Sequence, residues 1–384
     1  MNNIIKTDEL KESCNKILFA VDESCTGLEA GSLQIDICDG LLTLATTNKE
    51  YYVEVKNELT NTGLVDFSAT VNAKLFIKLV SQITTETIEL SINDQYLAIK
   101  GNGDYKLPLI FDNEKMFELP KIKIENEVTR FCTKTLNLQN ILQYNSKEIT
   151  KVPVAQMRSP VCAMYYLDRE GCITFIQGAC LNTFDIPEMM DEKILLTGKL
   201  VKLFKLLKDE DTLVILGRDK TITGVELPKI SFTCGNIRIT SLLSCEMSSL
   251  INVVPTTQIR KLATEECPYT VVVDKNSLVQ ALNRLLIFAT SISSLQKISF
   301  INIDFTSSCI TLSDAKGTNS EKVGYVSGCN LEGTYEAGIC LEDLKTTIES
   351  FNTSTVDIGF GNKKSMLAKS GNITVVMPEA KVRV

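Results

Sequence analysis

The side chains that most enzymes use for acid–base or nucleophilic chemistry are largely missing from this 384-residue sequence. There is no histidine, which removes the usual general base, the Ser–His and Cys–His nucleophile pairs and the commonest zinc ligand. No G-x-x-x-x-G-K-[ST] phosphate loop or G-x-G-x-x-G fingerprint occurs, and the Gly-x-Gly pieces at 101–103 and 359–361 are typical of β-turns. We therefore expect a protein that is not an enzyme and that uses no metal and no cofactor.

The cysteines indicate a reducing compartment. Their number, 13, is odd, and no C-x-x-C spacing is present, so we expect reduced, mostly buried thiols in a cytoplasmic protein. A hydrolase using carboxylates or a thiolate such as Cys180 is the enzymatic alternative, although it has no histidine partner. No apolar run approaches the ~18–20 residues that span a bilayer, and residues 1–10 do not form a signal peptide, so no membrane association is expected.

The lysines suggest another chemistry, the attraction of phosphate groups. The net charge of −7 argues against nucleic acid for the chain as a whole. In the helix predicted for 198–208, however, the apolar residues form one stripe and the lysines cover the other face. The basic residues expected to face a phosphate backbone lie on or beside several predicted helices and are Lys11, Lys16, Lys74, Lys78, Lys147, Lys151, Lys199, Lys202, Lys205, Lys275 and Arg284. Such a surface would hold a phosphate backbone without reading bases; the alternative is that these lysines only solvate exposed helix faces.

A threefold repeat organises the elements that carry these residues. Gly-Asn pairs between apolar runs stand at 101, 235 and 371, at nearly equal intervals, and predict tight turns. About sixty residues before each pair lies an alternating apolar hairpin, and these hairpins cover 33–44, 164–175 and 301–312. The chain is therefore expected to contain three copies of one unit.

Each copy also contains two helical patterns. The first set covers 7–18, 136–147 and 274–289, and the second covers 71–81, 197–208 and 341–351. Thr7 and Asp274 stand where an N-cap is expected. Each repeat is then an α+β unit, roughly βαβββ-αβββ, with its strands on one side and two helices on the other. The predicted domains are 1–124, 125–262 and 263–384, separated by polar, proline-containing stretches.

With these repeats the chain resembles the bacterial-type sliding clamp, the β processivity subunit of the replicative DNA polymerase. It would be a divergent, phage-like member of that family. The resemblance rests on the three-repeat layout, on Val253-Val254-Pro255 and on Val375-Val376-Met377-Pro378 near the C-terminus. It implies three sliding-clamp domains whose helices line the inner face and whose antiparallel sheets lie outside. It also implies a head-to-tail homodimeric ring that slides on duplex DNA and tethers the polymerase.

The resemblance further implies a pocket between domains 2 and 3 that accepts short apolar peptides of the polymerase and the clamp loader. Carried over by position, the partner-peptide pocket consists of Val161, Ile176, Gly178, Leu181, Pro255, Val375, Met377 and Pro378. Ala179 and Cys180 stand where the family has histidine and arginine, which predicts a less polar rim. Because several of these residues lie in alternating strands, the alternative is that they belong to the hydrophobic core.

The same resemblance implies the dimer contact. The edge strand around Tyr105, Leu107 and Leu109 is expected to lie against the partner subunit's Ile287 and the partner subunit's Phe288, with unpaired backbone groups covered by the contact. The function predicted from these observations is that of a DNA polymerase processivity factor. The alternative from another class of binding protein is a three-domain peptide-binding scaffold that does not encircle DNA.

Overall fold

The computed structural model of the protein describes residues 3–22, 27–60, 65–143, 164–174, 179–189, 192–243, 254–289, 300–306, 309–314, 317–328, 335–361 and 365–379. Its chain forms two compact units. Unit 1 comprises Met1–Leu136 with Leu203–Cys245, and unit 2 comprises Asn137–Lys202 with Glu246–Val384. Within the described residues, no helix has both the length and the apolar character needed to cross a bilayer.

Unit 1 contains most of the N-terminal half of the chain. Its elements are β1 (Asn3–Lys6), α1 (Thr7–Ala20), β2 (Ser32–Cys38), β3 (Leu41–Thr47), β4 (Tyr51–Glu58), β5 (Phe67–Asn72), α2 (Ala73–Gln82), β6 (Thr87–Ile92), β7 (Tyr96–Lys100), β8 (Asp104–Pro108), β9 (Phe111–Asp112), β10 (Lys115–Met116), β11 (Glu127–Lys134), η4 (Leu203–Leu206), β16 (Asp211–Lys220), β17 (Glu226–Cys234) and β18 (Ile237–Leu242).

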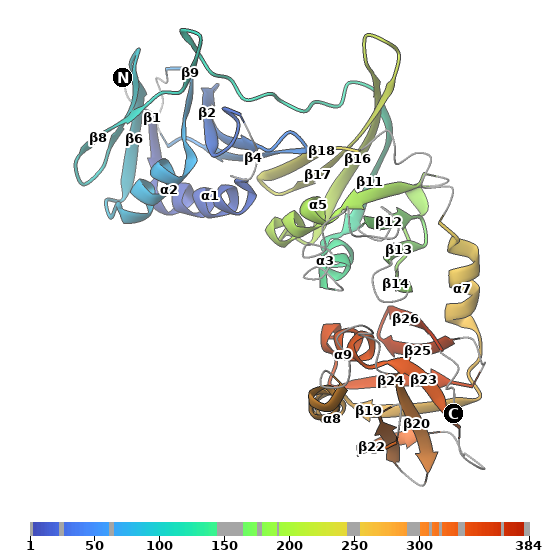
Figure 1. Ribbon diagram of the computed structural model, residues 1–384. Coiled ribbons are helices and arrows are strands. Elements are labelled where there is room, and N and C mark those ends of the chain that lie inside the picture. Colours follow the sequence, from blue (N-terminus) through green and yellow to red (C-terminus); the bar gives the residue numbers. More distant parts are fainter. Residues whose placement is uncertain are drawn as a thin grey trace. The chain divides into compact units, whose positions relative to one another are not determined.

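Antiparallel sheets form one face of unit 1 and helices cover the other. The described strands make a sheet in the order β1-β6-β7-β8 and a larger one in the order β11-β16-β17-β18-β4-β3-β2-β5. Helices α1 and α2 pack together, and α1 lies against β3 and β4 (Figure 1). We call this helix-covered side the inner face and the opposite side the outer face. The pairing of β18 with β4 is the seam at which strands of the first and second repeats join.

Unit 2 contains the remainder of the second repeat and all of the third. Its elements are α3 (Thr135–Gln143, which begins in unit 1), β12 (Met164–Asp168), β13 (Gly171–Thr174), β14 (Ala179–Thr183), η3 (Pro187–Met189), β15 (Ile194–Thr197), α5 (Gly198–Lys202), α7 (Thr256–Thr264), β19 (Tyr269–Asp274), α8 (Lys275–Ala289), β20 (Phe300–Thr306), β21 (Cys309–Ser313), β22 (Ser320–Gly328), β23 (Ala337–Cys340), α9 (Leu341–Ser350), β24 (Thr355–Phe360), β25 (Ser365–Ser370) and β26 (Ile373–Pro378).

One long sheet connects the strands of unit 2. Its order in the described residues is β15-β12-β13-β14-β26-β25-β24-β19-β22-β21-β20-β23, so β14 and β26 join the second repeat to the third. Helices α8 and α9 pack side by side over the core of the third repeat. On the other face of the β14–β26 pair, α7 packs against Leu181 and Val376.

The threefold repeat and the α+β fold class predicted from the sequence agree with this architecture. The order strand, helix, four strands, helix, three strands recurs three times in the described elements, with one more strand between the helices than the predicted three. Period-2 alternation explains the agreement at the first hairpin, where Leu33, Ile35 and Ile37 of β2 are at most 1% exposed. At the first hairpin, Asp39 and Gly40 both have positive φ, as a two-residue type I′ turn requires.

One of the two predicted N-caps is confirmed and the other is wrong. The Asp274 carboxylate accepts a hydrogen bond from the backbone N–H of Ser277 at 2.8 Å, which caps α8. Thr7 instead is the first residue of α1, where its buried hydroxyl has no hydrogen-bond partner. Residue type alone did not distinguish the last strand residue from the first helical one.

Candidate functional site

The predicted basic residues of the first repeat lie on helices α1 and α2. Lys74 and Lys78 are exposed on α2, whose opposite side buries Phe76 and Ile77. Lys11 is half-buried on α1. Lys16 forms an ion pair with Glu12 at 3.0 Å, and the hydrogen bond from Lys16 lowers the pKa of that carboxyl. The lysines are therefore on the helix side of unit 1, and the charge of Lys16 is partly neutralised by Glu12.

The second repeat contributes the segment 198–208, where the predicted apolar stripe is buried. Leu200, Leu203, Phe204 and Leu207 are each at most 2% exposed. The helix α5 ends at Lys202 and continues as the 3₁₀ turn η4, in which side chains three residues apart lie above one another. Lys199, Lys202 and Lys205 have this three-residue spacing. Lys199 and Lys205 are exposed and Lys202 is half-buried. The Lys205 Nζ lies 5.8 Å from the centre of the Phe19 ring of α1, within the range of a cation–π contact.

The cations predicted for the third repeat already have partners within the chain. Lys275 donates hydrogen bonds to the backbone carbonyls of Glu349 and Phe351, at the C-terminal end of α9. Arg284 forms a bidentate pair with Glu321 at 2.7 and 2.9 Å. Lys147 and Lys151 lie outside the described residues. Among the described residues, the exposed lysines of the predicted basic surface therefore lie in the first two repeats.

The residues predicted at a subunit contact differ in exposure. Leu107 and Leu109 are 7% and 8% exposed, so both side chains are buried. Leu107 lies opposite Leu97 of β7. Tyr105 is half-buried. Ile287 and Phe288, near the end of α8, are 67% and 46% exposed. The first group can offer mainly its strand backbone to a partner, whereas the second offers apolar side chains.

The predicted pocket residues lie on two faces of the β14–β26 pair. Val375 and Met377 are fully buried in the core of the third repeat, together with Cys180. Leu181 is on the opposite face, in the cluster under α7. Pro255, which precedes α7, and Pro378, at the end of β26, are exposed. Val161, Ile176 and Gly178 lie outside the described residues.

A groove of about 480 Å³ runs along α7 on the Leu181 side. Its apolar lining includes Ile173, Leu181, Phe184 and Ala263, all at most 8% exposed. The charged residues Glu170, Asp185, Arg260 and Lys261 also line it. A buried apolar floor with a polar rim is the form in which short peptide anchors are commonly held. Sequence reasoning identified Leu181 but not the α7 residues, whose amphipathic spacing resembles that of any surface helix.

An ion-pair cluster fixes α7 beside this groove. Arg260 donates to both carboxylate oxygens of Asp168 at 2.9 and 2.7 Å, and it pairs with Glu170 at 2.7 Å. Burial alone would lower the pKa of Arg260, but the hydrogen bonds and charges of these carboxylates raise it, so the guanidinium stays charged. Arg260 therefore positions the helix and leaves Lys261 as the exposed cation of the groove.

The cysteines in the described part of the chain are free thiols. Cys180 is 1% exposed, and burial raises the pKa of its thiol well above the ordinary value. A thiol in this state is a poor nucleophile, because the thiolate is the reactive form. The geometry at Cys180 thus disfavours the thiolate hydrolase considered from the sequence.

No protein family model matches the sequence, and no curated protein matches it either. Solved structures do match over nearly the whole chain. The DnaN sliding clamp (DNA polymerase III subunit beta) of Pseudomonas aeruginosa, solved bound to griselimycin, has a TM-score of 0.76 at 15% identity, covering 99% of each chain. The DNA polymerase sliding clamp of Bacillus subtilis has a TM-score of 0.74 at 18% identity, again covering 99% of each.

A third match is the beta subunit of DNA polymerase from Streptococcus pyogenes, with a TM-score of 0.77 at 15% identity, covering 99% of this chain and 100% of that one. At such identities the likeness establishes the fold. The chain has the sliding-clamp fold, as the resemblance read from the sequence implies.

Proposed function

We propose that the protein is a DNA polymerase processivity factor, a homodimeric ring that encircles duplex DNA and slides along it. The observation that carries the proposal is the match of fold over 99% of the chain to bacterial clamps. The protein would be divided into three clamp domains, 1–124, 125–262 and 263–384, so that two copies form a ring of six similar units. It would act in the cytoplasm without catalysing a reaction.

The pairing of strands within each unit supports ring closure. In both β18–β4 and β26–β14, the last strand of one repeat pairs with the third strand after the first helix of another. The strands in the equivalent positions of the first and third repeats are β8, at the edge of its sheet, and β22, which pairs with β21 through 320–324 and with β19 through 325–328. We propose that β8 pairs with the 320–324 part of β22 of a second copy, on the edge opposite β21, which brings Tyr105, Leu107 and Leu109 near the partner subunit's Ile287 and the partner subunit's Phe288. A head-to-tail contact that closes by rotation gives a ring.

The lysines on the helices support a sequence-independent contact with DNA. Exposed Lys74, Lys78, Lys199 and Lys205 would attract phosphates through a screened interaction that leaves sliding barriers small. Retention then depends on topology, because a closed ring cannot leave the duplex sideways. A polymerase tethered to the ring gains a high effective concentration at the primer end, which is the source of processivity.

The groove along α7 is the proposed site for the apolar peptide motifs of the replicative polymerase and the clamp loader. Its buried floor, which includes Leu181, Phe184 and Ala263, suits an aliphatic or aromatic anchor. The predicted pocket residues Val375 and Met377 would then support this site from the core of β26, while Pro255 and Pro378 would lie near its ends.

Release from DNA on linearisation tests the proposal. The protein is loaded on a nicked circular plasmid, by a clamp loader or at high protein concentration, and the complex is isolated by gel filtration. Cutting the plasmid once should release most of the protein, while an uncut sample retains it. Equal retention on cut and uncut DNA would indicate direct binding without encirclement. A monomer that binds polymerase but does not remain on circular DNA would instead support the peptide-binding scaffold.

A further inference from the structure

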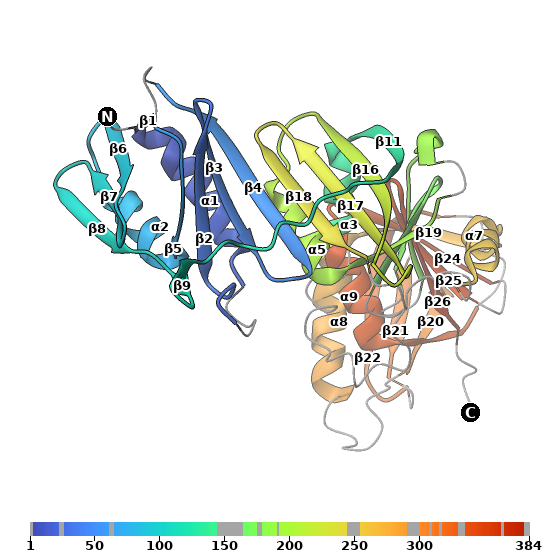
Figure 2. The same ribbon diagram turned by 90° about the horizontal axis from the view of Figure 1, so that it is seen from above.

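The connector 117–126, which links the first repeat to β11, crosses the outer face of the large sheet in unit 1. Figure 2 shows it running across the strands on the side opposite α1 and α2. It passes from the β2–β3–β4 part of the sheet to the β16–β17–β18 part, and so spans the seam. A flexible tether would need no specific contacts along this path, whereas the connector is held at both ends.

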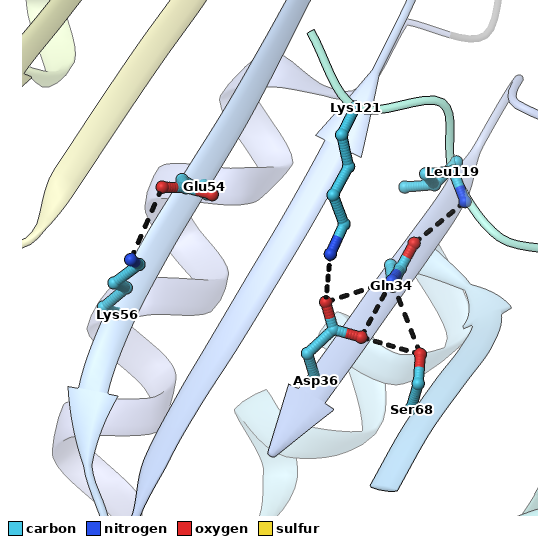
Figure 3. A network of polar contacts seen from close by, with 7 residues as sticks. All are labelled: Gln34, Asp36, Glu54, Lys56, Ser68, Leu119 and Lys121. Atoms are coloured by element: carbon cyan, nitrogen blue, oxygen red, sulfur yellow. Dashed lines mark hydrogen bonds and ion pairs between the residues drawn. The ribbon is translucent and has the colours of Figure 1, made fainter. Parts of the chain in front are cut away.

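The first anchor is a polar network on β2 (Figure 3). The side-chain oxygen of Gln34, a residue 2% exposed, accepts a hydrogen bond from the backbone N–H of Leu119 at 2.8 Å. Lys121 pairs with Asp36 at 2.9 Å. Asp36 also accepts hydrogen bonds from Gln34 and from Ser68, which hold its carboxylate in position to pair with the lysine. Leu119 itself packs on Ala45 and Tyr52 of the sheet.

The second anchor lies on β16 and β17, beyond the seam. The Asp219 carboxylate accepts hydrogen bonds from the backbone N–H groups of Glu125 at 3.1 Å and Asn126 at 2.7 Å. Lys229 donates to Asp219 at 2.5 Å and to the Lys123 carbonyl at 2.5 Å. The side chains of Lys229 and Asp219 are only 13% and 5% exposed, so this ion pair is shielded from solvent. A buried carboxylate that binds two connector amides is a specific attachment.

Glycine at position 217 lets the connector lie close to β16. A Cβ on Gly217 would fall 2.3 Å from the Cγ2 of Ile124 and 3.0 Å from the Asn126 carbonyl oxygen. Any larger residue would therefore push the connector away from the second anchor.

The same seam is also bridged at its edge by contacts from Asn236. The Asn236 carbonyl accepts a hydrogen bond from the backbone N–H of Lys56 at 2.9 Å, and its side chain binds the Lys56 carbonyl at 3.1 Å. Lys16 of α1 donates to the Asn236 side chain at 2.9 Å. The seam is thus held from the helix side as well as from the connector side.

We propose that the connector 117–126 is a strap that holds the β4–β18 seam together. Gln34 and Asp36 form its first anchor, and Asp219 and Lys229 form its second. The first repeat and the strands β11 and β16–β18 then move as one body, and bending of the protein takes place elsewhere. The residues named are positioning residues, and the inference holds whether or not the protein encircles DNA.

Hydrogen exchange of the intact protein tests the strap. In the double variant Gln34→Ala with Asp219→Ala, the amides of Leu119, Glu125 and Asn126 should exchange at least about tenfold faster. The seam amides of Lys56 and Leu242, which bond to Asn236 and Glu50 across it, should accelerate with them. Amides between β2 and β3 should keep their rates. Acceleration confined to the connector amides would overturn the proposal, because the connector would then be a tether only. Unchanged exchange rates at all of these amides would overturn it as well.

Two milder variants keep the test decisive if the double variant does not fold. Gly217→Ala should lift the connector at the second anchor without changing any charge, and Lys121→Gln removes the more exposed ion pair at the first. Both should accelerate the seam amides in the same direction, and unchanged seam rates in both would reject the strap. Lys134→Gln is the matched control, because Lys134 forms exposed ion pairs with Glu210 and Asp211 in the same unit but does not touch the connector.

Discussion

Removing two apolar side chains from the end of α8 should weaken the proposed ring strongly. The perturbation is the double variant Ile287→Ala with Phe288→Ala. Burying a large aliphatic or aromatic side chain completely is worth about 1.5–3 kcal/mol. These two side chains are 67% and 46% exposed in the single chain, so that much of their surface is still available for burial by a partner. Together they should contribute about 2–3 kcal/mol to each interface.

A closed dimer contains two such interfaces, so the loss is counted twice. The dissociation of the ring should become easier by about 4–6 kcal/mol, which corresponds to an increase of roughly 10³–10⁴ in the dissociation constant. Because both residues are exposed in the single chain, the variant should remain folded. The assay is sedimentation velocity over a dilution series from micromolar to low nanomolar protein.

The matched control replaces apolar residues of similar exposure at a site without a proposed partner. Ile222 and Val225, in the turn between β16 and β17, are fully and 51% exposed. Ile222→Ala with Val225→Ala should leave the dissociation constant unchanged. The reasoning fails if the α8 variant sediments as the unchanged dimer at every concentration, or if the control weakens the dimer equally.

Three further outcomes are expected. Replacing Lys74, Lys78, Lys199 and Lys202 by glutamate should reduce retention on circular DNA and flatten its dependence on salt, with thermal unfolding changed little; retention equal to the wild type at low salt would mean that these lysines only solvate the surface. Thr264→Trp fills the groove along α7 from an exposed lining position, and it should reduce polymerase pull-down and primer-extension length at least about tenfold while the ring stays on DNA. Gln258→Trp, at an exposed position of α7 outside the groove lining, should reduce neither. Equal effects of both variants would place the partner site elsewhere. Burial would raise the pKa of Asp219, but hydrogen bonds from Lys229 and from two backbone amides lower this pKa overall. The charged carboxylate therefore stabilises the fold above the unfolded-state pKa of about 3.9, and that stabilisation is lost as the pH falls below this value. The urea midpoint of Asp219→Asn should therefore drop less steeply with falling pH than that of the wild type.

Periodicity predicted most of the repeat, and it did so where one face of an element is buried. The hairpin at 33–44 is predicted because alternate residues, such as Leu33, Ile35 and Leu42, enter the core, whereas the described strand residues of the hairpin at 164–175 are buried on both faces. The Gly-Asn turns follow for the same reason, with Gly235 and Gly371 at positive φ. The first turn differs, since Lys100 pairs with Asp104 and three residues, 101–103, form the turn.

The pairing between repeats could not be predicted, because alternation does not say which strand lies at an edge or what covers it. That limitation explains the predicted pocket. Val375 and Met377 share one face of β26 and Val376 has the other, so the face that borders a groove depends on the pairing with β14. The helix face of Lys275 and Arg284 was predicted, but their partners Phe351 and Glu321 are far away in the sequence.

The proposed function also accounts for a fold that is retained at 15–18% identity to clamps when no sequence model matches. A ring that holds DNA by topology needs its curvature and its closure, which backbone pairing such as β18–β4 and β26–β14 supplies with many different side chains. Its contact with phosphates needs only cations on the inner helices. The contact with partners is different, because an apolar anchor must fit a particular groove. Divergence should therefore have the largest functional effect at the groove along α7, whose apolar lining includes Leu181, Phe184 and Ala263. Cys180, which was expected at the pocket rim, instead lies on the opposite face of β14, in the core of the third repeat.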